Sequence, residues 1–180
     1  MKTQVLSQKF FERSTITVAK DLLGKYLVRR RGKKVEKFII TEIEAYKGLK
    51  DKASHASRRK TKRNAPMFGE AGHWYVYFTY GMHWMLNIVT GPKNYPAAVL
   101  IRDVDGINGP ARITKQLKID KKFNNKLAMP KSDLWIEENS KFKNSKFEIR
   151  NSPRIGVNYA GPIWSKKKWR FTLINIDKNV

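Results

Sequence analysis

Two glutamates stand two residues apart in the segment VEKFIITEIEAY, residues 35–46. If this segment is a β-strand, Glu42 and Glu44 point to the same face, with about 6.5–7 Å between their Cα atoms. Three interpretations of the pair remain open at this point. It can be a solvated strand face, the carboxylates of an enzyme that hydrolyses a glycosidic bond, or part of a divalent-metal site with Asp51 or Asp103 as further oxygen ligands.

The other metal-binding residue types give little support to a metal site. His55, His73 and His83 show neither an HExxH motif nor any other closely paired spacing, and the chain has no cysteine. Thiolate zinc sites, disulfides and cysteine nucleophiles are therefore excluded. We expect neither a bound metal nor an organic cofactor.

A strongly basic segment, SRRKTKRN, occupies residues 57–64. It is either a solvated loop or a phosphate clamp, because arginine, lysine, threonine and asparagine are the residue types that contact nucleic-acid backbones. Its position favours the clamp, since it connects the end of the glutamate segment to an aromatic one. The residues that we expect to contact DNA here are Arg58, Arg59, Thr61, Lys62, Arg63 and Asn64.

The aromatic segment reads WYVYFTYGMHWMLN, residues 74–87. Alternating aromatic side chains are typical of a packed β-strand, so most of these rings are expected in the core. Tyrosine rings also stack on nucleobases, and their hydroxyls need hydrogen-bond partners. Tyr80 precedes Gly81 at a predicted tight turn, where a ring would be poorly buried, and it is a candidate wedge between base pairs.

The hydrophobic pattern predicts the elements that must hold these residues. A helix begins at Thr17 and ends at Gly24, and a second helix covers 108–119. Within 35–46, alternation places Ile40 on the face of Glu42 and Glu44. Residues 47–72 form a long polar loop, and 139–146 a polar surface segment. The predicted strands are 26–30, 35–46, 74–80, 83–90, 97–102, 134–138, 147–150 and 169–176.

The charge balance indicates a polyanionic partner. The chain has 38 Lys+Arg against 15 Asp+Glu, a formal net charge of +23, which favours a nucleic acid or an anionic membrane surface. A lysine-rich source proteome is the alternative explanation. No apolar run approaches the ~20 residues that span a bilayer, and the first residues lack the apolar core of a secretory signal. We expect an intracellular, cytoplasmic protein, nucleoid-associated if bacterial, that is not secreted and has no membrane partner.

Five motifs in order give a more specific indication: E-x-E-A-Y (42–46), S-H-A (54–56), R-N-x-x-M-F-G (63–69), Y-V-Y-x-x-Y-G-M (75–82) and R-I-G (154–156). Together with VLIR (99–102), this series closely resembles the alkyladenine (3-methyladenine, methylpurine) DNA glycosylases. The resemblance extends from about Ser14 to Phe171. It implies base-excision repair, in which the N-glycosidic bond of an alkylated or deaminated purine, such as 3-methyladenine or hypoxanthine, is hydrolysed after the base flips out of duplex DNA.

The same resemblance implies roles for individual residues of the reaction. The residue matching the family's water-activating glutamate is Glu44. Arg102 and the backbone at Ile155 help to hold that water. The stacking pocket around the flipped base is made by Tyr46, His55 and Tyr77.

Three further residues are carried over, two for contacts with DNA and one for selection of the base. Tyr80 intercalates into the gap that the base leaves, and Met67 joins the residues that contact DNA. Asn87 disfavours ordinary guanine, because its side chain lies where guanine's 2-amino group would collide.

The prediction is therefore one glycosylase domain, residues 1–180, that is monofunctional, metal-independent and monomeric, acting on double-stranded DNA that contains damaged purines. The expected fold is α+β: a single compact domain around a curved, largely antiparallel β-sheet, with a DNA-inserting β-hairpin and peripheral helices. The chain departs from the family at DVDGIN (103–108), where a longer stretch is usual, and over 120–150, where it matches poorly. A noncatalytic nucleic-acid-binding module and a metal-dependent nuclease remain as alternatives.

Overall fold

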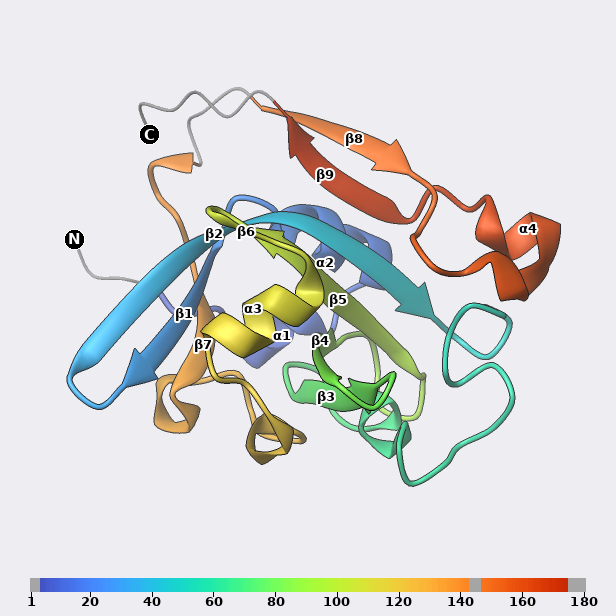
Figure 1. Cartoon of the computed structure of the whole chain (residues 1–180), viewed down its shortest axis with the longest axis horizontal. Helices are drawn as coiled ribbons and strands as arrows, with labels where there is room; N and C mark the ends of the chain where they lie inside the picture. The colour runs from blue at the N-terminus through green and yellow to red at the C-terminus, as the bar shows by residue number, and fades with distance from the viewer. Residues whose placement is uncertain (1–3, 143–146, 175–180) are drawn as a thin grey trace.

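The computed structural model describes residues 4–142 and 147–174. Parts of two predicted segments, residues 143–146 and 175–176, lie outside this range. The described part of the chain is a curved antiparallel sheet with short helices around it, as Figure 1 shows. The α+β prediction is confirmed.

The described residues form short helices, 3-10 turns and strands. The helices are α1 (Gln8–Phe11), α2 (Thr15–Leu22), α3 (Pro110–Gln116) and α4 (Gly161–Ser165), with 3-10 turns η1 (Ala65–Phe68), η2 (Lys121–Phe123), η3 (Pro130–Ser132) and η5 (Asn158–Ala160). The strands are β1 (Tyr26–Arg31), β2 (Lys34–Lys47), β3 (Trp74–Thr79), β4 (His83–Val89), β5 (Ala97–Val104), β6 (Ile107–Asn108), β7 (Leu134–Glu137), β8 (Glu148–Ser152) and β9 (Arg170–Ile174).

The long strand β2 organises the sheet, whose main order is β3-β4-β5-β2-β1-β7. Its first half pairs with β1, and its second half pairs with β5 on one side and with β9 on the other. The β8–β9 ribbon therefore runs along β2 and leads to α4 (Figure 1). The basic turn between β1 and β2 lies at the opposite end of β2 from Tyr46, so it is remote from the glutamate pair.

An irregularity in β2 changes which side chains enter the core. The register against β5 shifts between Ile40 and Ile43, and such a bulge reverses the face taken by the following residues. As a result, Ile40 and Ile43 are both completely buried in the same apolar cluster, although a regular strand would put them on opposite faces. Our placement of Ile40 beside Glu44 is wrong for this reason.

The main core lies between the sheet and its helices. Val18 and Leu22 of α2 pack with Ile43 of β2 and Trp74 of β3, all fully buried. α2 contacts β2 and β5, and α3 contacts β4 and β5. The first of these helices begins earlier than predicted, with Ser14 at its N-cap. No helix within residues 4–142 and 147–174 is long and apolar enough to cross a membrane.

Candidate active site

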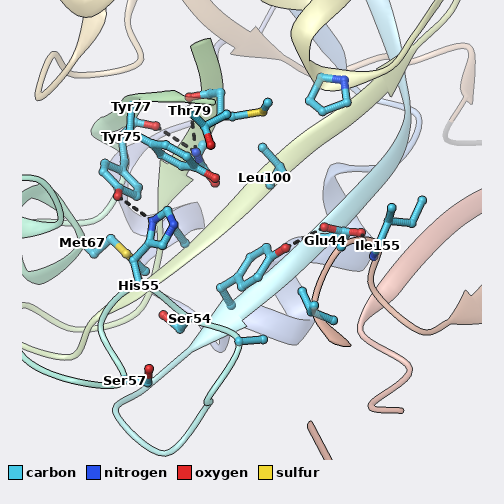
Figure 2. A pocket seen from close by; sticks show the side chains of 18 of the residues that line it. Glu44, Ser54, His55, Ser57, Met67, Tyr75, Tyr77, Thr79, Leu100 and Ile155 are labelled. Atoms are coloured by element: carbon cyan, nitrogen blue, oxygen red, sulfur yellow. Dashed lines mark hydrogen bonds between the residues drawn. The ribbon is translucent and has the colours of Figure 1, made fainter. Parts of the chain in front are cut away.

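An open pocket of about 850 Å³ lies over the second half of β2. It is lined by side chains from β2 to β5, by the loop that follows β2, and by residues 155–159 before α4. Figure 2 shows His55, Tyr75 and Tyr77 on one side of the pocket and Glu44 with Ile155 on the other. Segments distant in sequence thus meet around one cavity.

Glu44 is the carboxylate that lines the pocket, and it has no exposed surface. Its Oε2 accepts a hydrogen bond from the Tyr46 hydroxyl at 2.7 Å, and its Oε1 accepts one from the Ile155 amide at 2.7 Å. A guanidinium nitrogen of Arg102 lies 3.4 Å from the same Oε1. These donors compensate the burial of a negative charge. Because a carboxylate has about four acceptor sites, at least one remains for another donor.

Glu42 holds the other side of Arg102. The Arg102 Nε donates to Glu42 Oε1 at 3.0 Å, and Glu42 Oε2 accepts from Arg170 at 3.1 Å and from the Thr172 hydroxyl at 2.8 Å. Glu42 is only 7% exposed. The interpretation of the two glutamates as a solvated strand face is therefore wrong.

The segment that presents the Ile155 amide is anchored by a buried ion pair. Arg154 binds Asp51 through two hydrogen bonds of 2.6 and 2.8 Å and donates a third, at 2.9 Å, to the Ala45 carbonyl. Both charged side chains have no exposed surface. The guanidinium also lies 4.7 Å from the centre of the Tyr46 ring. The loop after β2, the 152–157 segment and Tyr46 are thereby fixed relative to one another.

The electrostatics of Tyr46 keep its hydroxyl protonated. Burial, with a further contribution from the charge of Glu44, raises its pKa well above the usual value for tyrosine. The group is therefore a permanent donor to Glu44 at neutral pH.

A cluster of three rings forms the wall opposite Glu44. The centre of the His55 ring lies 4.6 Å from that of Tyr77, and the Tyr75 and Tyr77 centres are 5.1 Å apart. The His55 Nδ1 shares a 3.0 Å hydrogen bond with the Tyr75 hydroxyl. His55 keeps an exposed edge at the open pocket, yet burial and then the charge of Arg63 lower its pKa, so the imidazole is neutral at pH 7.

Asn87 lies on β4 and is almost fully buried beneath the pocket. Its Nδ2 donates to the Tyr75 carbonyl at 3.1 Å and to the Met85 carbonyl at 3.4 Å. These two backbone contacts fix the plane of the amide. Asn87 is thus a rigid polar group at the pocket floor.

The β3–β4 turn presents a tyrosine to solvent. Tyr80 is 81% exposed, and both it and Gly81 have positive φ values, 52° and 65°. A left-handed conformation is unfavourable for a tyrosine, by about 1–3 kcal/mol. Arg63 supports the hairpin by donating to the Phe78 carbonyl at 2.8 Å. The turn therefore holds an aromatic ring outside the fold at the mouth of the pocket.

The basic segment divides into exposed cations and buried supports. The exposed residues of the segment include Arg58, Arg59, Thr61, Lys62 and Arg63. Asn64 is 2% exposed, and its side chain bonds the backbone of residues 55, 59 and 61. Met67 is also 2% exposed and packs under Tyr75. Asn64 and Met67 thus lie beneath the surface where we expected DNA contacts.

The structure brings together Glu44, Tyr46, His55, Tyr77, Asn87, Arg102 and Ile155, and places Tyr80 at the rim. Asp51 and Asp103 were the further ligands considered for a metal site. Asp51 has both oxygens bound to Arg154, and the Oδ1 of Asp103 accepts from the Gly109 amide. Within the described ranges no three acidic, histidine or cysteine side chains could hold a metal ion. We assigned no role to Arg154, although it begins the R-I-G motif, and we expected most rings of the aromatic segment in the core. Tyr75 is buried as that expectation implies, and its hydroxyl also bonds His55.

Known proteins resemble the chain over nearly its whole length. A sequence model of the methylpurine-DNA glycosylase family matches residues 9–107 and 103–176, two stretches that meet at the short 103–108 connection. A protein of Legionella pneumophila (strain Corby) is 42% identical over 173 residues, which cover 92% of each chain. One from Sodalis glossinidius is 41% identical over 179 residues, 95% of this chain and 98% of its own. Both relatives are provisionally named 3-methyladenine DNA glycosylases.

Proposed function

Because the chain belongs to the methylpurine-DNA glycosylase family, we propose that it excises alkylated and deaminated purines, such as 3-methyladenine and hypoxanthine, from duplex DNA. The observation that carries this proposal is the position of Glu44, a fully buried carboxylate that faces three aromatic rings across an open pocket. A base between those rings would present its sugar toward the carboxylate. The proposed active unit is one monomeric domain, residues 1–180.

In the proposed reaction Glu44 accepts a proton from the water that attacks C1′. The C1′–N bond breaks as the new C1′–O bond forms, and the purine leaves with the bonding electrons. A fixed anion beside C1′ also stabilises the oxocarbenium-like transition state. Arg102 and the backbone at Ile155 lie against Glu44, which supports a role for both in orienting the water.

The pocket chemistry suits a damaged purine. Alkylation at N3 or N7 makes the purine cationic and a good leaving group, so one carboxylate suffices. A neutral His55 beside Tyr77 does not repel such a cation, and tyrosine faces attract it. Hypoxanthine is neutral and needs a proton donor as well.

Base flipping needs a group that fills the vacated space in the DNA stack, and selection needs one that rejects normal bases. Tyr80, exposed on its strained turn, suits the first task because an aromatic ring can replace the lost stacking. The immobilised amide of Asn87 suits the second. A rigid polar group under the base opposes guanine, since the exocyclic 2-amino group would need that space.

The proposal is tested with duplex oligonucleotides that each carry one hypoxanthine, ethenoadenine or 7-methylguanine. The full-length protein should release the base and leave an intact backbone that breaks only on alkali treatment, both with and without EDTA. Glu44→Gln should bind the same duplex and release no base. Strand scission without alkali that EDTA abolishes would indicate a nuclease instead, and release by Glu44→Gln would refute the assigned base.

A further inference from the structure

A second buried carboxylate, Glu42, has no part in the reaction described above. It is 7% exposed, and burying a carboxylate costs several kcal/mol unless the charge is paired. The pairing is extensive: Arg102 binds one oxygen, and Arg170 and Thr172 bind the other. The Oδ1 of the neighbouring Asp103 accepts a hydrogen bond from the Gly109 amide at 2.6 Å.

The contact with Arg102 determines where that guanidinium lies. A guanidinium is planar, so a hydrogen bond to Nε fixes the direction of its other nitrogens. The Nε of Arg102 lies 3.0 Å from the Glu42 carboxylate, whereas the shortest distance from the guanidinium to the Glu44 carboxylate is 3.4 Å. The first distance lies within the range of about 2.7–3.2 Å of N–H···O hydrogen bonds, whereas the second exceeds it. Arg102 is thus bonded firmly to Glu42 and only loosely to Glu44.

Arg170 and Thr172 hold Glu42 itself in place from β9. Arg170 also donates to the carbonyl of Pro153 at 3.0 Å, within the 152–157 segment that presents the Ile155 amide. The carboxylate is therefore held by two strands at once, since β2 carries it and β9 supplies two of its donors. The Glu42 carboxylate therefore cannot move with Arg102 toward Glu44 unless its hydrogen bonds to Arg170 and Thr172 break.

We propose that Glu42 is a positioning residue that keeps Arg102 from closing onto Glu44. In this arrangement Glu44 retains a free acceptor site, while Arg102 remains available to the attacking water. The inference rests on the proposed function. Without the Glu42 charge, Arg102 forms a full ion pair with Glu44, which occupies the oxygen that must accept the proton of the water.

The test measures two quantities with the full-length protein. One is the single-turnover rate of ethenoadenine release at saturating protein, and the other is the Kd for a duplex with an uncleavable abasic analogue. Glu42→Gln should lower the rate by about 10- to 100-fold, the effect of small misplacements at a reacting centre, and leave the Kd within about threefold. Glu137→Gln is the matched control, because Glu137 is also buried and paired, with Lys37, but lies on β7 at the far edge of the sheet. It should leave both quantities unchanged.

A double-mutant cycle separates positioning from a general effect on folding. In an Arg102→Met background, Glu42→Gln should cause no further loss of rate, because the group through which it acts is absent. Independent, multiplying losses would overturn the proposal, as would a Glu42→Gln variant that matches the wild type. If Glu42→Gln does not fold, Glu42→Asp retains the charge but shortens the reach to Arg102, and the same cycle applies. Absence of base release by the wild type would instead refute the proposed function.

Discussion

Replacing Arg154 by methionine should destabilise the protein more than the loss of any surface charge. The substitution keeps an unbranched apolar chain but leaves Asp51, whose side chain has no exposed surface, without its cation. Removing one partner of a buried pair costs about 3–5 kcal/mol. For 180 residues the entropy of unfolding is about 0.4 kcal/mol per kelvin, so the Tm should fall by about 8–13 °C.

The exposed pair between Arg13 and Asp21 is the matched control, with side chains 40% and 46% exposed. Such surface pairs contribute about 0–1 kcal/mol, so Arg13→Met should lower the Tm by less than about 3 °C. The double variant Arg154→Met with Asp51→Asn removes both buried charges and should be more stable than Arg154→Met alone.

Thermal unfolding followed by circular dichroism measures all of these variants. If Arg154→Met and Arg13→Met unfold within 3 °C of each other, the reasoning about the buried pair is wrong. Base release provides a second readout, measured well below each Tm. It should fall for Arg154→Met, because the freed 152–157 segment no longer holds the Ile155 amide against Glu44.

Four other predictions concern DNA and base recognition. Tyr80→Ala should raise the Kd for lesion-containing duplex by about 5- to 150-fold, which corresponds to the loss of about 1–3 kcal/mol of stacking free energy. An unchanged Kd would exclude the role of Tyr80 as a wedge. Asn87→Ala should begin to release guanine from undamaged DNA, measured by chromatography, and a variant that still spares guanine would remove the steric explanation. Replacing Arg58 and Lys62 by serine should reduce the slope of log K against log salt by about 1.8 if both contact phosphates. Because the pKa of His55 is lowered, binding of a cationic lesion should weaken only as the pH falls below about 6.5, and His55→Gln should remove that loss.

The sequence was sufficient for the elements whose pattern is local. The two strands of the aromatic hairpin, 74–80 and 83–90, appear within one residue of their predicted bounds, because alternation and a glycine turn specify a hairpin. The helix predicted over 108–119 covers only Pro110–Gln116, and Lys118 beyond it has a positive φ of 51°. The face of Ile40 depended on a bulge against β5, which no periodicity within β2 reveals.

The sequence was sufficient to predict which residues belong to the site. It was not sufficient to predict the hydrogen bonds and ion pairs between them. Motif resemblance gave Glu44 and Tyr46, but the hydrogen bond between them depends on a side-chain rotation that spacing does not specify. The partners of Glu42 on β9 lie 128 and 130 residues away, and Arg154 lies 103 residues from Asp51. Such pairs form because the fold buries both charges in one place, which is a property of the whole chain.

One donor of the pocket belongs to the main chain. The Ile155 amide binds Glu44 at 2.7 Å, while the Ile155 side chain is 51% exposed. Truncating that side chain leaves the donor in place, so an alanine scan of the pocket would report position 155 as dispensable. Only proline, which has no N–H, removes the contact, and natural variation in side-chain size at this position therefore says nothing about how much the reaction depends on it.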